Sequence, residues 1–155
     1  MLLSSKDGSS LEGLWFLQQR FCARGLEGER EIVRLPVFEE TEAWLDRFFR
    51  GIDPGPAPKL SPAGTGFQLR VWAEMKEIPY GETRSYGELA SALAAQEGRR
   101  ISPRAVGAAV ARNPISILLP CHRVLAADGS LHGYAGGIWR KAALLSMEQG
   151  ISFMK

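Results

Sequence analysis

A cysteine, a histidine and an arginine follow one another at the end of an apolar segment, NPISILLPCHRV, residues 113–124. Pro120 cannot donate a backbone hydrogen bond and typically ends a strand, so we expect the Cys121 thiol at a strand end. A thiol becomes a strong nucleophile as the thiolate, which a neighbouring base or positive charge favours. Cys121 and His122 are thus a candidate nucleophile and base. The alternative is that Cys121 is a small buried apolar residue, the commonest role of a free cysteine.

The relative placement of these two side chains is a geometric problem. Adjacent residues of an extended strand point to opposite faces, so His122 serves Cys121 only if the chain turns there or a water bridges them. Glu148, in the predicted final helix, is a candidate carboxylate to hold the imidazole, although composition alone does not select it. A cysteine hydrolase is a rival interpretation, but no residue beyond the Cys-His pair supports it.

Helix-start signals follow one another in the second half of the chain. Thr65, Ser85 and Ser102 are predicted N-caps, and Glu88 completes a capping box with Ser85. Pro114 stops the third helix just before it. The second and third helices together resemble a helix-turn-helix, although their connector is longer than usual.

The third of these helices, RAVGAAVAR over residues 104–112, carries almost no large side chains. Small residues favour close packing on another helix, or entry into a narrow space such as the DNA minor groove with Arg104 and Arg112 reaching outward. The sequence leaves both open. Four arginines and no acidic residue lie between positions 99 and 112. Such a basic stripe fits either phosphate binding or a solvated helix face.

The remaining elements are assigned from periodicity and turn residues. In the first half we expect strands over residues 11–17 and 32–38. A helix capped by Thr41 should then turn Trp44, Leu45, Phe48 and Phe49 inward, before an extended proline-rich connector over residues 52–64. In the second half we expect a buried strand over residues 115–119, a turn at Asp128-Gly129, a flexible loop over residues 133–137 and a helix over residues 138–149 that ends at Gly150.

Composition excludes several classes of protein. The chain has 155 residues and a net charge of +2. Its first ten residues hold no hydrophobic run long enough for a secretion signal, so we expect none, and no stretch approaches the roughly 18 apolar residues of a membrane span. Cys22 and Cys121 lie far apart, and both histidines come late in the chain, so we predict no disulfide framework and no zinc site. A reducing compartment, cytoplasmic or nuclear, fits best.

The motif PCHRV is preceded by RAVGAAVARNP and followed by GYAGG and a helix ending in LLSMEQG. This series resembles the O6-alkylguanine-DNA alkyltransferase family, the methylated-DNA–protein-cysteine methyltransferases, over roughly residues 66–150. DGSSLEGLWF in the first half is similar to the family's N-terminal domain. The resemblance implies an α+β fold, with a small N-terminal α/β, RNase H-like domain over residues 1–64 packed on a helical domain over residues 65–155. The second domain would contain a winged-helix-like helix-turn-helix.

The resemblance also implies a reaction. Cys121 would accept the alkyl group of O6-alkylguanine in double-stranded DNA, with O4-alkylthymine as a second candidate substrate. His122 would deprotonate the thiol through a water, and Glu148 would orient His122. The damaged nucleotide must be flipped out of the helix to reach the thiol. The family needs no cofactor, and we expect a monomer that acts once, because S-alkylcysteine is not hydrolysed.

The resemblance implies roles for the residues around the thiol as well. Arg104 would enter the base stack, and Tyr86 would crowd a phosphate so that the nucleotide rotates out. Asn113 would be the hinge between the DNA-binding helix and the active-site strand. The other DNA-binding residues would be Ala105, Ala108 and Arg112, and Tyr134 and Gly136 would line the guanine pocket. A helix-turn-helix regulator without chemistry is the second rival, but inert relatives lack the acceptor cysteine.

Overall fold

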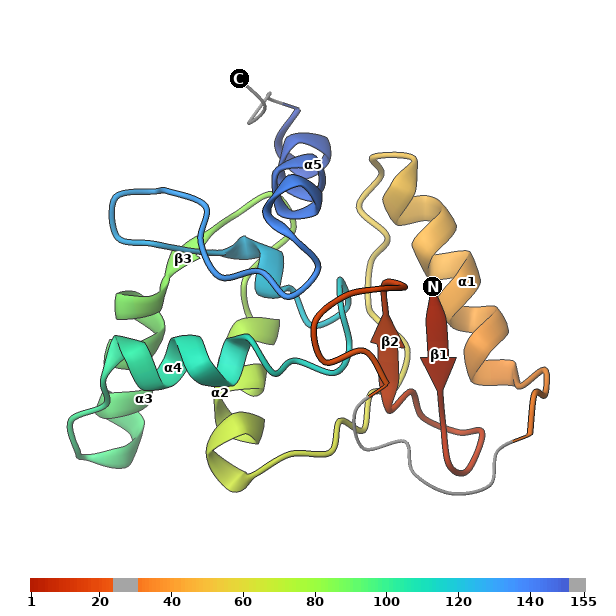
Figure 1. The fold of residues 1–155 in the computed structure, drawn as a ribbon, viewed down its shortest axis with the longest axis horizontal. Coiled ribbons are helices and arrows are strands. Elements are labelled where there is room, and N and C mark those ends of the chain that lie inside the picture. The colour runs from red at the N-terminus through yellow and green to blue at the C-terminus, as the bar shows by residue number, and fades with distance from the viewer. Residues whose placement is uncertain (24–30, 151–155) are drawn as a thin grey trace.

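The computed structural model describes residues 1–23 and 31–150. These residues form five α-helices, one 3-10 helix and two two-stranded sheets, which confirms the α+β class. Strands β1 (Leu2–Ser4) and β2 (Gly13–Trp15) pair antiparallel, and β3 (Arg84–Ser85) and β4 (Val124–Leu125) pair parallel. The helices are α1 (Pro36–Phe49), α2 (Gly66–Lys76), α3 (Tyr86–Glu97), α4 (Pro103–Val110), the 3-10 helix η1 (Cys121–Arg123) and α5 (Ile138–Gln149). In Figure 1, β1, β2 and α1 lie on one side, α2 to α4 lie on the other, and α5 lies above and between them.

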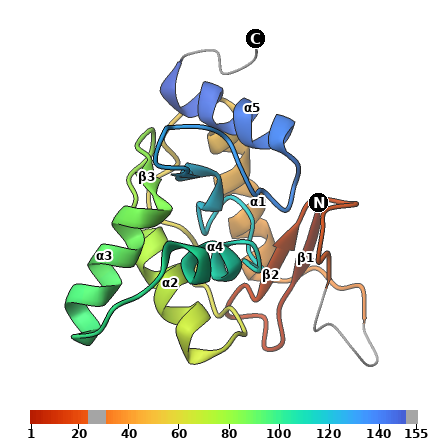
Figure 2. The ribbon, with the colours of Figure 1, turned by 60° about the vertical axis from the view of Figure 1, so that its left-hand side comes forward.

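The three predicted N-caps of the second half are confirmed. The side-chain oxygens of Thr65 and Ser85 each accept the backbone N–H of the N3 residue, at 3.3 and 3.1 Å. In return, the side chains of the N3 residues, Gln68 and Glu88, accept the backbone N–H of the cap residue at 2.9 and 2.6 Å. Ser102 accepts a backbone N–H at 3.1 Å. The caps satisfy N–H groups that have no partner inside the helix. Helices α2, α3 and α4 pack against one another and lie together in both ribbon views (Figures 1 and 2).

The first half differs from the prediction at α1. The described residues 31–35 contain no strand, and the helix begins at Pro36. Proline at the first helical position has a preset φ and lacks only an N–H that would be unpaired there, so the helix starts six residues earlier than a Thr41 cap predicts. Thr41 therefore lies inside α1, where its Oγ1 donates to the Val37 carbonyl at 2.6 Å. The predicted strand over residues 32–38 and the predicted Thr41 cap are both wrong.

Helix α1 packs its aromatic face on the second half of the chain. Phe48 is fully buried, stacks on Trp44 at 5.5 Å and meets the His122 ring edge-on at 6.1 Å between ring centroids. Phe49 is 48% exposed, so its predicted inward orientation is wrong. Strand β2 lies within the predicted segment 11–17, and residues 52–64 form the expected non-helical connector. Helix α1, in the first half of the chain, therefore packs directly against His122 through Phe48.

The predicted strand over residues 115–119 is wrong. Its one pairing with another described segment is a single bridge between Ile115 and Leu14. At Ile117 the backbone has φ = +71°, a left-handed conformation that breaks an extended strand. The Leu119 N–H then donates back to the Ile115 carbonyl at 3.1 Å, so the chain coils and enters η1 at Cys121. Apolar composition reported the burial of this segment but not its backbone conformation.

The late turn and the last helix agree with prediction. Gly129 has φ = +79° and donates its N–H to the Ala126 carbonyl at 3.0 Å. Helix α5 ends at Gly150, whose φ of 63° is the left-handed conformation typical of a helix C-terminus. No helix among the described residues is both long and apolar enough to cross a bilayer.

Candidate active site

The Cys121 thiol lies at the start of η1, held by the asparagine that follows α4. Asn113 Nδ2 lies 3.0 Å from Cys121 Sγ and 2.8 Å from the Leu119 carbonyl, and donates to both. Asn113 Oδ1 accepts the Ile115 N–H at 2.9 Å. One amide therefore joins the end of α4 to the turn that carries the thiol.

Cys121 is buried, and its protonation follows from that. Burial raises the pKa of the thiol, while the Asn113 hydrogen bond and the charge of Lys141 oppose the rise without cancelling it. The resting side chain is thus a thiol at neutral pH. A reaction that needs the thiolate needs a base nearby.

His122, the next residue along the chain, is the base that the sequence predicts. Its side chain is fully buried, and its Nε2 lies 2.7 Å from Glu148 Oε1. Burial lowers the pKa of His122, so the ring is neutral near pH 7, and Nε2 carries the proton because it faces a carboxylate. Nδ1 then carries the lone pair, and it has no hydrogen-bond partner within the described chain. Cys121 and His122 lie in the 3-10 helix η1, so their side chains do not point to opposite faces as they would in an extended strand.

Arg123 completes a buried ion pair with Glu148. Its Nε and Nη2 donate to the two carboxylate oxygens, each at 2.9 Å, and Nη1 donates to the Ile78 carbonyl at 2.7 Å. Burial alone would raise the pKa of Glu148, but the hydrogen bonds from His122 and Arg123 outweigh it and lower the pKa to about 2. Arg123 was not among the predicted site residues. The available signal was a charged side chain directly after an apolar run, which needs a buried partner.

The low pKa of Glu148 predicts how stability depends on pH. The folded carboxyl has a pKa of about 2 against an ordinary value of 4.5, so its contribution is present above pH 4.5 and is lost as the pH falls toward 2. We expect the free energy of unfolding to drop by about 3 kcal/mol across that window from this group. Urea unfolding at a series of pH values measures the drop. A Glu148→Gln variant that loses as much stability in the same window would contradict the assignment.

Two tyrosines approach the thiol from other elements. The Tyr134 hydroxyl is buried beside Cys121, and burial, followed by the charge of Cys121, raises the pKa of Tyr134 well above its ordinary value. Tyr86, at the start of α3, donates to the His132 carbonyl at 3.2 Å, and the pKa of Tyr86 is also raised by burial and then by Cys121. Gly136 lies against Tyr134, since an added Cβ would be 2.7 Å from Tyr134 Cε1.

Lys141 is a buried cation that was not among the predicted site residues. Its Nζ donates to the Val124 carbonyl at 2.5 Å and to the His132 carbonyl at 3.0 Å. Burial lowers the pKa of Lys141 to about 8, and the Cys121 thiolate opposes this shift. The sequence signal was a lysine seven residues before Glu148, on the core-facing side of the last helix. Its positive charge favours the thiolate form of Cys121.

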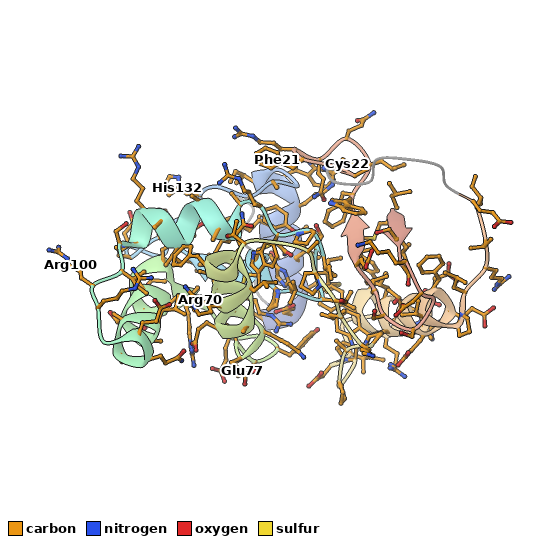
Figure 3. The ribbon with its side chains drawn as sticks, turned by 90° about the horizontal axis from the view of Figure 1, so that it is seen from below. Phe21, Cys22, Arg70, Glu77, Arg100 and His132 are labelled. Carbon is orange, nitrogen blue, oxygen red and sulfur yellow. The ribbon has the colours of Figure 1, made fainter. Side chains whose placement is uncertain are left out.

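Helix α4 has one packed face and one exposed face. Trp72 Nε1 donates to the Ala109 carbonyl at 3.0 Å and holds the helix on α2. Arg104 makes no hydrogen bond or ion pair with any residue that the structure describes, and Arg100 projects outward from the connector before the helix (Figure 3). The exposed face includes Arg104, Ala105 and Ala108, and the exposed Arg112 follows two residues after the helix ends. Helix α4 therefore packs closely on α2 through one face and leaves a surface of small residues exposed on another.

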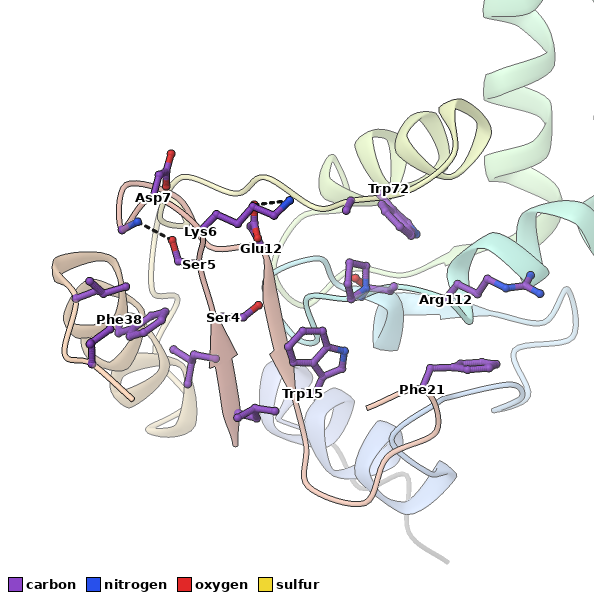
Figure 4. Close-up of a pocket in the computed structure, with 18 of the residues that line it drawn as sticks. Ser4, Ser5, Lys6, Asp7, Glu12, Trp15, Phe21, Phe38, Trp72 and Arg112 are labelled. Atoms are coloured by element: carbon purple, nitrogen blue, oxygen red, sulfur yellow. Dashed lines mark hydrogen bonds and ion pairs between the residues drawn. The ribbon is translucent and has the colours of Figure 1, made fainter. Parts of the chain in front are cut away.

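A hollow of about 1130 Å³ lies between the β1–β2 sheet and α2, and Asn113, whose amide contacts the thiol, is among its lining residues. Glu12, Trp15, Trp72 and Arg112 are among the residues around it (Figure 4). Neither Cys121 nor any side chain of the His-Glu pair lines it. Residues 1–23 and 31–150 also contain no group of three His, Cys, Asp or Glu side chains that could hold a metal ion. Cys22 is a free, half-buried thiol beside Phe21 (Figure 3).

Together the site and the fold define a class of protein, one that combines an exposed small-residue helix with a buried thiol and a buried His–Glu pair that begins at the next residue. The sequence profile described as "6-O-methylguanine DNA methyltransferase, DNA binding domain" matches residues 66–150. The chain is 50% identical over 113 residues to a methylated-DNA–protein-cysteine methyltransferase of Mycobacterium leprae, an alignment that covers 73% of this chain and 66% of the relative. With the Haemophilus influenzae protein of the same name it shares 37% identity over 149 residues, or 96% of this chain and 80% of the relative.

A solved structure extends the likeness to the fold. The crystal structure of Mycobacterium tuberculosis OGT in complex with DNA superposes with a TM-score of 0.77 at 40% identity, covering 97% of this chain and 86% of that one. The chain belongs to the methylated-DNA–protein-cysteine methyltransferase family. This confirms the resemblance seen in the sequence and makes the chain a DNA repair methyltransferase with a DNA-binding domain.

Proposed function

We propose that this chain repairs duplex DNA by moving the alkyl group of O6-alkylguanine onto Cys121 in a single displacement. The observation that carries the proposal is the buried thiol followed by a histidine whose Nε2 is held by Glu148 and whose Nδ1 is unpartnered in the described chain. The thiol proton passes to Nδ1 of His122 through a water. The carboxylate of Glu148 then stabilises the resulting imidazolium.

The displacement needs no cofactor, because the alkyl group and the leaving group both come from the substrate. The Cys121 sulfur forms a bond to the alkyl carbon, the bond from that carbon to O6 breaks, and its electron pair leaves with the guanine. A hydrogen bond from the Tyr134 hydroxyl to the base assists departure, and Tyr134 and Gly136 line the pocket. The product is a thioether that water does not cleave, so each molecule acts once. O4-alkylthymine offers the same chemistry and is the second candidate substrate.

The DNA-binding surface of this proposal is the exposed face of α4. Arg104 fills the gap in the stack when the nucleotide is flipped, and Tyr86 crowds the phosphate. Asn113 transmits the position of the helix to the thiol, because its amide contacts Cys121 directly. The small side chains of Ala105 and Ala108 allow close approach to the minor groove, and Arg112 contacts the backbone. The partner is double-stranded DNA, bound by a monomer.

We extend the proposal to organisation and compartment. Residues 1–64 form the α/β, RNase H-like unit and residues 65–155 the helical, winged-helix-like unit. The packing of Phe48 on His122 supports a role for the first unit as a wall of the active site. The two free cysteines fit a reducing compartment, cytoplasmic or nuclear.

The decisive experiment follows a labelled methyl group. Duplex DNA carrying O6-methylguanine with a labelled methyl should transfer it to Cys121 in at most an equimolar amount, located by peptide mass spectrometry. Cys121→Ser should take up no label while still binding DNA. Turnover beyond one equivalent, as a hydrolase would show, or binding without transfer, as a regulator would show, would overturn the proposal.

A further inference from the structure

A short segment of the first half packs against the loop that carries Tyr134. The Arg20 N–H donates to the Ala135 carbonyl at 3.0 Å. An added Cβ on Gly136 would lie 3.2 Å from Phe16 Cδ2 and 2.7 Å from Tyr134 Cε1, so Gly136 fills a space between the two rings. Phe16 therefore packs against the loop at Gly136, beside the Tyr134 ring.

Arg140 joins this support from α5. Its Nη1 donates to the Gly136 carbonyl at 2.6 Å. Its guanidinium carbon lies 5.1 Å from the centroid of the Phe16 ring and 4.4 Å from that of Trp139. A guanidinium can both stack on rings and donate to a carbonyl, which a lysine ammonium cannot do in the same planar geometry.

Phe16 is itself anchored to the thiol-bearing half of the chain. Gln19 is only 6% exposed, and its Oε1 accepts the Phe16 N–H at 2.8 Å and the Ser116 hydroxyl at 3.0 Å. Ser116 lies in the turn that leads to Cys121. The support for the loop and the support for the nucleophile therefore share one hydrogen-bonded anchor.

The loop needs this support because its backbone is permissive. Gly133 and Gly137 have φ of 64° and 92°, and glycines populate many conformations at little cost. Within the loop, the Gly137 N–H donates to the Tyr134 carbonyl at 3.0 Å. The position of the buried Tyr134 hydroxyl beside Cys121 depends in addition on the contacts that Phe16 and Arg140 make with Gly136.

We propose that Phe16 and Arg140 are positioning residues for the alkylguanine pocket: they clamp Gly136 and thereby hold the Tyr134 ring beside Cys121. This inference rests on the proposed function and adds to it a contribution from the first half of the chain. The clamp acts on substrate placement and leaves the thiol and its base untouched.

The test compares a substrate that needs the pocket with a reagent that does not. Free O6-benzylguanine must be placed in the pocket, whereas iodoacetamide reports the thiolate alone; peptide mass spectrometry separates reaction at Cys121 from reaction at Cys22. Arg140→Met should slow reaction with O6-benzylguanine by about tenfold or more, since misplacement by about 1 Å can cost about a hundredfold. Its iodoacetamide rate should equal that of the parent within error, and Arg140→Lys should lie between the two.

A second variant and a matched control sharpen the result. Phe16→Leu should give a similar selective loss, and the double variant should lose less than the product of the two single losses, because both residues act on Gly136. Arg34→Met removes an exposed arginine paired with Glu39 and should change neither rate.

The inference is overturned if Arg140→Met reacts with O6-benzylguanine at the parent rate. It is equally overturned if both reagents slow by the same factor, because Arg140 would then act on the thiol or the fold. If neither O6-benzylguanine nor methylated DNA alkylates Cys121 of the parent protein, the proposed function is wrong, and this inference, which rests on it, is wrong as well.

Discussion

Glu148→Gln is expected to slow alkyl transfer to Cys121 by at least about a hundredfold, since a positioned general base contributes about 10²–10⁴-fold. In the parent protein the carboxylate fixes the proton of His122 on Nε2, across 2.7 Å, and leaves Nδ1 free to accept a proton. A glutamine amide can present N–H groups instead of oxygens, which permits the opposite tautomer. It also carries no charge to stabilise the imidazolium. Second-order rate constants with methylated duplex DNA measure the effect.

This variant also affects the fold, so the rate alone is not sufficient. Arg123 would lose its carboxylate partner in a buried site, a change that typically costs about 3–5 kcal/mol. The pH dependence separates the two effects. Burial raises the pKa of Cys121, so without the relay the thiolate fraction, and with it the rate, should climb steadily as the pH rises.

The expected result is therefore partial rescue of Glu148→Gln and His122→Ala at high pH, with a flatter profile for the parent. A merely destabilised protein would show no such rescue. If both variants react at the parent rate between about pH 6 and about pH 9, His122 is not the base and the relay assignment is wrong.

Local signals predicted the helices of the second half because the determinants lie within a few residues of one another. The cap at Ser85, for example, is satisfied by the side chain and backbone of Glu88, three residues on. Thr41 failed as a cap because Pro36, five residues earlier, already provides a helix start. Where two local signals compete, the one with the preset backbone prevails.

The turn over residues 115–119, before the active site, could not be predicted from neighbouring residues. Its apolar residues predicted burial, which is correct, and a strand, which is wrong because Ile117 adopts a left-handed backbone. That conformation is compensated by contacts distant in sequence, including the bond from Ser116 to Gln19, 97 residues away. The same holds for Arg123 and Lys141, whose buried partners could not be read from their neighbours. Cys121 and His122 could be proposed as nucleophile and base from the sequence because they are adjacent residues, and their roles stay a prediction that the rate measurements above test.

The second large effect is expected at Arg104. Arg104→Ala should slow repair of O6-methylguanine in duplex DNA by about tenfold to a thousandfold, because the side chain offsets unstacking that costs a few kcal/mol, and each 1.4 kcal/mol is about a tenfold change. Arg104 is exposed and has no ion pair or hydrogen bond within the described chain, so its removal should leave the fold intact. Reaction with free O6-benzylguanine, which involves no flipping, should be unchanged.

Two controls distinguish insertion into the stack from simple charge. Arg34→Ala removes one positive charge from an exposed ion pair in the first half and should leave both rates alone. Arg112 is an exposed arginine two residues after the end of α4. Arg112→Ala should weaken DNA binding uniformly and reduce the slope of affinity against salt by about one, as loss of a phosphate contact does. Arg104→Ala should instead affect the transfer step more than binding, because the flipped state is the one it stabilises. Equal losses on duplex DNA and on the free base would show that Arg104 supports the fold or the pocket, and the minor-groove role of α4 would have to be abandoned.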